Sequence, residues 1–134
     1  MERVNRRNLL VSLAGIAAMQ AQNPSASSKS VFQHDLPDVD IKNWAVNVAE
    51  ITYPPGGVSA AHRHPGITLV YVLEGEIVSS VGDGPEQTYG PGQMFMETPN
   101  QLHGVSRNAS KTKPAKFIAL LLAEKGKPLT TPAK

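Results

Sequence analysis

The sequence contains no cysteine, which excludes disulfide frameworks, thiolate zinc sites, iron–sulfur clusters and cysteine nucleophiles. Any bound metal ion must therefore be held by nitrogen and oxygen atoms. Aromatic residues make up only 5% of the chain, so aromatic platforms for stacking single-stranded nucleic acid are not expected. The net charge of +2 arises where Arg3, Arg6 and Arg7 outweigh Glu2, and the rest of the chain is formally neutral. We therefore expect no nucleic-acid partner.

The chain also lacks an apolar run long enough to span a bilayer stably. Its most apolar stretch, residues 9–19, is well short of the about 20 residues that a membrane helix needs. A basic start precedes it and a small polar stretch follows, which is the layout of a cleavable signal peptide over residues 1–26. The pair Arg6 and Arg7 resembles the twin-arginine export motif of bacteria, and an ordinary signal with two adjacent arginines is the alternative. We expect a periplasmic or secreted protein, with the cleavage position left open.

Beyond residue 22 the sequence lacks a sustained helical period. Short apolar or alternating runs, separated by Gly, Pro, Asn and Asp clusters, instead predict strands at residues 44–53, 68–73, 76–81, 87–89, 94–97, 102–108 and 116–123. Short strands at this spacing are typical of all-β proteins. We expect an antiparallel jelly-roll β-barrel over residues 41–124. A linker or edge segment over residues 27–40 precedes it, and a C-terminal tail over residues 125–134 follows.

Three of the four histidines lie where they could converge. His62 and His64 are two residues apart, so on an extended strand both imidazoles point to the same face. His103 opens a later predicted strand and could add a third nitrogen ligand. Neutral imidazoles bind Fe, Mn, Ni and Zn. The pattern predicts a divalent metal site, although the His-x-His pair alone fits a surface strand equally well.

Two stretches around these histidines resemble the two sequence motifs of the cupins. They read GGVSAAHRHPGITLVYVLEG over residues 56–75 and GQMFMETPNQLHGVSRN over residues 92–108. The resemblance covers roughly residues 44–123 and implies a small single-domain bacterial cupin. It implies no single activity, because cupins include dioxygenases, isomerases, lyases, sugar binders and storage proteins.

The resemblance implies that His62, His64 and His103 are the metal ligands, and it places the family's usual glutamate ligand at Thr68. A hydroxyl is a poor ligand for a divalent ion. The site would then be a three-histidine site with open water positions, a weakened site, or no site. A site without the acid carries one more positive charge, which favours an anionic substrate.

Other residues near the motifs are candidates for the surroundings of the metal. Glu97 and Gln101 lie close to His103 in sequence and could orient the metal ligands through hydrogen bonds without binding the metal themselves. Arg107 could reach a substrate carboxylate or lie exposed at the rim. Strand alternation indicates that five apolar residues form either the core or a pocket wall: Val70, Val72, Met94, Met96 and Val105.

The sequence thus predicts an exported small cupin that binds a divalent metal through three histidines. It would act on a small organic molecule, expected to be anionic, as a dioxygenase, an isomerase or a decarboxylase. The alternative is a non-catalytic cupin that binds a small molecule, or an accessory cupin, without tight metal, so the sequence does not decide whether the protein is an enzyme. A homodimer that pairs through edge strands is a further expectation.

Overall fold

The computed structural model describes residues 25–134. The predicted signal peptide therefore lies outside the described residues, apart from its last two positions. Between residues 25 and 134 there is no helix, and hence none of a length and hydropathy that could cross a membrane. The predicted all-β architecture is confirmed for this part of the chain.

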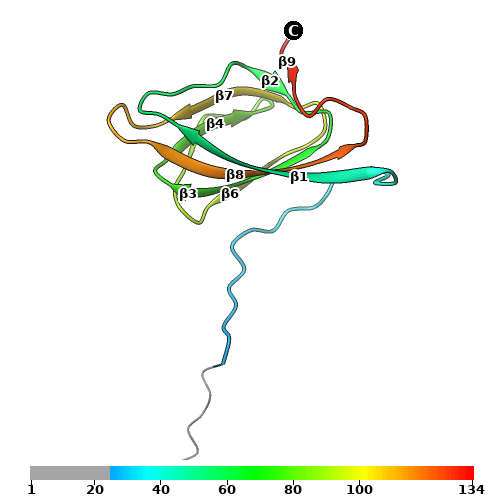
Figure 1. Cartoon of the computed structure of the whole chain (residues 1–134), viewed down its shortest axis with the longest axis horizontal. Coiled ribbons are helices and arrows are strands. Elements are labelled where there is room, and N and C mark those ends of the chain that lie inside the picture. Colours follow the sequence, from blue (N-terminus) through cyan, green and yellow to red (C-terminus); the bar gives the residue numbers. More distant parts are fainter. Residues whose placement is uncertain (1–24) are drawn as a thin grey trace, which may run out of the picture.

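The strands form two antiparallel sheets that face one another (Figure 1). The four-stranded sheet has the order β1 (Trp44–Tyr53), β8 (Ala115–Glu124), β3 (Ile67–Glu74) and β6 (Met94–Glu97). The five-stranded sheet has the order β5 (Gln87–Tyr89), β4 (Ile77–Val81), β7 (Leu102–Asn108), β2 (His62–Arg63) and β9 (Thr131–Pro132).

All seven predicted strands are present, with ends displaced by at most one residue. The prediction missed β2 and β9, which are two residues long each. Strand β9 lies in the segment predicted as a C-terminal tail, and there Thr131 and Pro132 pair with Arg63 and His62. Residues 27–40 form no strand or helix.

The core lies between the two sheets. Alternation along β8 buries every second side chain, and these pack against the inward side chains of β1, β3, β4 and β6. The buried cluster consists of Tyr53, Val70, Val72, Ile77, Phe95, Ala115 and Phe117. Removal of this apolar surface from water is the main source of stability.

Gly66 allows the chain to pass from the histidine pair into β3. A Cβ at this position would lie 1.9 Å from the carbonyl oxygen of Leu122 on β8. Any other residue would therefore push β3 away from β8. The absence of a side chain at Gly66 thus allows the segment next to His64 to pass close to β8.

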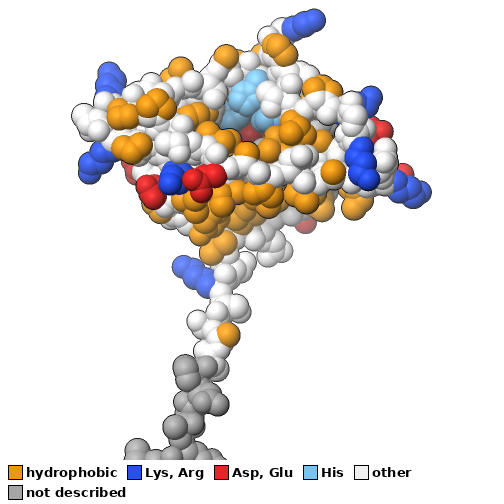
Figure 2. Space-filling view, in the orientation of Figure 1, with side chains coloured by type: hydrophobic (Ala, Val, Ile, Leu, Met, Phe, Trp, Pro, Cys, Tyr) orange, Lys and Arg blue, Asp and Glu red, His pale blue; other side chains and the backbone are white. Residues whose placement is uncertain are grey.

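The edge strands of the two sheets are β1, β6, β5 and β9. On β1, Val46 and Val48 are 61% and 63% exposed, on the outer side of the four-stranded sheet. The side chains on the lower face in Figure 2 are largely hydrophobic. Homodimer formation remains a prediction. The surface relevant to it is the edge strand β1 with its exposed valines, together with the hydrophobic lower face.

Candidate metal centre

The five-stranded sheet brings the three predicted histidines together. His62 on β2 and His103 on β7 are direct partners in the antiparallel ladder, and their ring centroids are 4.9 Å apart. The ring of His64, two residues further on, lies 4.8 Å from that of His62. The cluster is open to one side, because His62 is half-buried whereas His64 and His103 are buried.

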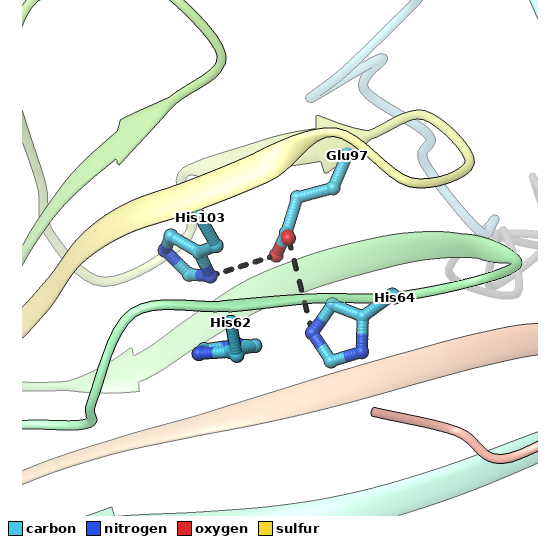
Figure 3. Close-up of side chains that lie close together, drawn as sticks. All are labelled: His62, His64, Glu97 and His103. Atoms are coloured by element: carbon cyan, nitrogen blue, oxygen red, sulfur yellow. Dashed lines mark ion pairs between the residues drawn. The ribbon is translucent and has the colours of Figure 1, made fainter. Parts of the chain in front are cut away.

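A fourth side chain, the carboxylate of Glu97, lies among the histidines (Figure 3). Its Oε1 is 3.2 Å from Nδ1 of His103, and its Oε2 is 3.8 Å from Nε2 of His64. One potential ligand atom from each of the four residues lies within 4.8 Å of all the others. The sequence predicts Glu97 as a residue that supports the histidine ligands from outside the ligand set. The structure instead places its carboxylate beside the three imidazoles.

Glu97 and Thr68 occupy equivalent places on neighbouring strands. They are direct partners in the ladder between β3 and β6, and both line the same cavity. The carboxylate that the motif lacks on β3 is thus supplied by β6. The expectation of a cluster without an acid is wrong, although Thr68 does face the site as expected.

Two backbone carbonyls fix the tautomers of His62 and His64. Nδ1 of His62 lies 2.7 Å from the Ala60 oxygen, and Nδ1 of His64 lies 2.7 Å from the Leu129 oxygen. A carbonyl only accepts hydrogen bonds, so each Nδ1 carries the proton and donates it. In the neutral rings each Nε2 is then left with a free lone pair, which is the form that binds a metal.

His103 is oriented by a different group. Its Nε2 lies 2.8 Å from the Ser79 hydroxyl on β4, which is itself buried. This contact leaves Nδ1 directed at Glu97. The sequence did not predict the roles of Ser79 and Leu129, because they depend on strand pairings that join distant segments.

Three buried polar atoms at this cluster form no hydrogen bond with any of the described residues: Thr68 Oγ1, Glu97 Oε2 and His103 Nδ1. Leaving such a group unpaired typically costs about 1–3 kcal/mol, and more when it is charged. A buried carboxylate surrounded by imidazole lone pairs is stable only if a cation or protons lie between them. The donor set therefore fits a divalent metal ion.

The local environment also favours the neutral state of His62. Burial lowers the pKa of His62 below its usual 6.5, outweighing the Ala60 carbonyl, which raises it. The neighbouring His103 and His64 lower the pKa further, and Glu97 acts in the opposite direction. A neutral imidazole is ready to bind a metal without first losing a proton.

The cluster lies in a cavity of about 630 Å³ between the sheets. In Figure 2 the histidines are visible at the floor of a hollow framed by other side chains. The cavity wall is mainly apolar and includes Ala49, Ile51, Val70, Ile77, Phe95, Phe117, Ala119, Leu121 and Leu129. Val70 is therefore in the wall, whereas Val72 is fully buried in the core.

The interpretation of Met94 and Met96 as wall residues is wrong. They do share a face of β6, but Phe95 and Glu97 are the buried residues of that strand and the ones that line the cavity. Alternation predicts which residues lie together and does not say which face is turned inward.

The interpretation of Val105 and Arg107 as residues on the His103 face is also wrong. Ser80 pairs with Val105 and Val81 pairs with His103, so Gly104 is an extra residue in β7, a β-bulge. The bulge reverses the alternation, and Ser106 is the next inward residue. Arg107 instead forms an ion pair with Glu86, 2.6 Å away.

Gln101 does not support the histidines either. Its Oε1 accepts hydrogen bonds from the backbone and side chain of Thr98, at 3.1 and 3.3 Å. It closes the turn between β6 and β7 and does not line the cavity.

Residues 49–121 match the model of the cupin domain. The chain is 33% identical over 111 residues to germin-like protein subfamily 2 member 4 of Arabidopsis thaliana, covering 79% of this chain and 50% of that protein. The chain thus spans about half the length of this curated relative.

Solved structures share the fold at low sequence identity. One is the DMSP lyase DddQ of Ruegeria pomeroyi, with a TM-score of 0.57, 18% identity, and coverage of 66% of this chain and 43% of that one. Another is the polyketide cyclase RemF of Streptomyces resistomycificus, with a TM-score of 0.55, 20% identity, and coverage of 66% and 61%. With two facing antiparallel sheets, consistent with a jelly roll, and a matching domain over residues 49–121, the chain belongs to the cupin family.

Proposed function

We propose that this protein binds a divalent metal ion through His62, His64, Glu97 and His103, and acts on a small organic molecule in the adjoining cavity. The observation that carries the proposal is the set of three buried polar atoms at the cluster that lack hydrogen-bond partners among residues 25–134. Nitrogen and oxygen donors of this kind suit Fe, Mn, Ni or Zn.

The residues of the cluster and their neighbours would contribute to holding such an ion in different ways. Glu97 offsets one of its positive charges, while the carbonyls of Ala60 and Leu129 keep His62 and His64 in the tautomer that binds. The hydroxyl of Ser79 orients His103. When bound, the metal supplies Lewis acidity or a centre for O₂ chemistry. The mainly apolar wall offers contacts to an organic ligand.

Oxygenation, isomerisation and decarboxylation are the reaction classes that we propose to assay. The alternative is a cupin that binds its ligand without transforming it. One observation favours this alternative: apart from the four residues of the cluster, the Tyr53 hydroxyl is the only ionisable group among the described residues that line the cavity. A proton transfer would thus have to use the cluster or Tyr53.

Metal content and thermal stability test the proposed function. The purified protein is expected to contain stoichiometric metal, and after chelation its melting temperature should rise when Mn(II), Ni(II) or Zn(II) is added, because a ligand of the folded state stabilises it. His103→Ala should abolish this rise at micromolar metal. His34→Ala, which removes an exposed histidine outside the cluster, is the matched control and should behave as wild type. Melting temperatures indifferent to all three metals would contradict the proposal.

We also propose that the chain is exported, on the basis of the sequence pattern over residues 1–26. Twin-arginine recognition needs the paired guanidinium groups, whereas a general signal needs only positive charge. Changing both Arg6 and Arg7 to Lys should therefore retain the protein in the cytoplasm, as measured by cell fractionation. Export at the wild-type level would assign the signal to the general route.

A further inference from the structure

A second polar cluster lies in the same cavity as the proposed metal site, and it consists of hydroxyl groups. The Tyr53 hydroxyl lies 2.5 Å from Oγ of Ser59 and 2.9 Å from Oγ of Ser106. All three residues line the cavity. We refer to these three residues as the hydroxyl cluster.

Backbone and aromatic contacts of the fold hold the hydroxyl cluster in place. The backbone N–H of Ser59 donates to the Ser106 carbonyl at 2.9 Å, which holds the two serines side by side. The ring of Tyr53 packs edge-on against Phe117, with centroids 5.2 Å apart. Its hydroxyl is thereby fixed at the cavity wall.

Three hydroxyl groups joined by two hydrogen bonds retain a third proton and several lone pairs. The cluster can therefore both donate to and accept from a ligand. It carries no charge, and no Lys, Arg or Asp is among the described residues that line the cavity. A carboxylate or phosphate placed here would lose its hydration without gaining a counter-charge.

Glu97 also weakens the attraction of the proposed metal site for an anion. A cluster without an acid would favour an anionic substrate, whereas this cluster contains one. The positive charge available to a ligand is reduced accordingly, and the rest of the wall offers apolar contacts.

The position of the hydroxyl cluster relative to the metal site sets the length of the ligand. Ser106 lies three residues beyond His103 on β7, and Ser59 lies three residues before His62. At about 3.3 Å per strand residue, shortened by the bulge, the backbones of His103 and Ser106 are about 8–10 Å apart. A cavity of about 630 Å³ is within the usual range for small-molecule sites.

We infer that the cavity takes an uncharged, mainly apolar molecule about 8–10 Å long, whose hydroxyl or carbonyl group hydrogen-bonds to Tyr53, Ser59 and Ser106. The inference rests on the proposed function, because it treats this cavity as the ligand site. Tyr53 is then a residue that determines specificity, at the end of the cavity away from the histidines.

Three probes of similar size test the inference: 4-phenylphenol, biphenyl and biphenyl-4-carboxylate, titrated calorimetrically into metal-free protein. We expect 4-phenylphenol to bind about fivefold more tightly than biphenyl, which corresponds to one neutral hydrogen bond. The carboxylate should bind at least about tenfold more weakly than 4-phenylphenol, because its charge is buried without a partner.

Tyr53→Phe keeps the ring and removes the hydroxyl, so it should abolish the preference for 4-phenylphenol over biphenyl without weakening biphenyl. Ser106→Ala serves as a second variant and should reduce the same preference. Tyr71→Phe is the matched control, because Tyr71 points away from the cavity on β3, and it should retain the wild-type selectivity.

Tighter binding of the carboxylate than of 4-phenylphenol, an unchanged preference in Tyr53→Phe, or no binding of any probe at millimolar concentration would overturn the inference. The zinc-induced rise in melting temperature is measured on the same preparations. An intact rise with unselective probe binding would overturn the inference alone. Selective probe binding without any rise would overturn the proposed metal function alone.

Discussion

The two polar clusters of the cavity share two parts of the chain and differ in how their polar atoms are paired. Both use β7 and the segment that leads into or forms β2. In the hydroxyl cluster, the Tyr53 hydroxyl is paired with both serines. The other cluster consists of His62, His64, Glu97 and His103, and we refer to it as the metal cluster. In it, Glu97 Oε2 and His103 Nδ1 have no hydrogen-bond partner within the described part of the chain.

This difference indicates what each cluster requires. Neutral hydroxyl groups satisfy one another and are stable with or without a ligand. A buried carboxylate beside imidazole lone pairs requires a positive charge, which only a cation or added protons provide. The metal cluster should thus respond strongly to metal, and the hydroxyl cluster should not.

The largest expected effect comes from moving the carboxylate between neighbouring strands. Glu97→Thr removes the anionic ligand and should weaken Zn(II) binding by about 100-fold or more, since even the loss of an outer partner of a ligand costs 10- to 100-fold. The double variant Thr68→Glu/Glu97→Thr returns a carboxylate to the same part of the cavity from β3. It should recover binding to within about tenfold of wild type in zinc titrations.

Ser106→Ala is the control from the hydroxyl cluster. It should lower the melting temperature equally in the presence and absence of Zn(II), and its zinc affinity should match that of wild type. A double variant no better than Glu97→Thr would show that the two positions are not interchangeable.

A smaller effect is expected from pH in the metal-free protein. Because the pKa of His62 is lowered by burial from its usual 6.5, the unfolded chain binds a proton more readily than the folded one. The contribution of His62 to stability is fully present above pH 6.5 and is lost as pH falls through its lowered folded value. Urea unfolding between pH 7.5 and 5.5 should show this decline.

In His62→Asn the free energy of unfolding should fall less steeply with falling pH. The variant lacks the His62 imidazole, whose pKa is lowered in the folded protein, whereas His103, His64 and Glu97 remain. Tyr53→Phe should decline as steeply as wild type. Equal slopes for wild type and His62→Asn would contradict the assignment of the pH effect to His62.

Much of this architecture could be predicted from the sequence because it depends on local patterns. Turn residues bound each long strand, and the alternation of β8 buries Phe117, Ala119 and Leu121. The spacing of His62 and His64 places them on one face in any extended conformation. These features need no knowledge of which strands are neighbours.

The errors arose where strand pairing decides the outcome. The bulge at Gly104 exists only relative to β4, and it moved Val105 and Arg107 off the face of His103. The inward direction of Phe95 and Glu97 depends on how β6 joins β3. Strands as short as β2 and β9 carry too few residues to show any alternation.

The contact between His64 and Leu129 has a consequence for how the site is assembled over time. These residues are 65 positions apart in the sequence, and His62 pairs with His103 across another long separation. Contacts of such long range form slowly, because a large loop must close first. The four residues of the cluster meet only when these long-range pairings have formed, so a metal ion bound as proposed would enter a site that is already folded. The compartment in which the chain folds would then determine which metals compete for it, since copper and zinc displace weaker binders wherever they are free.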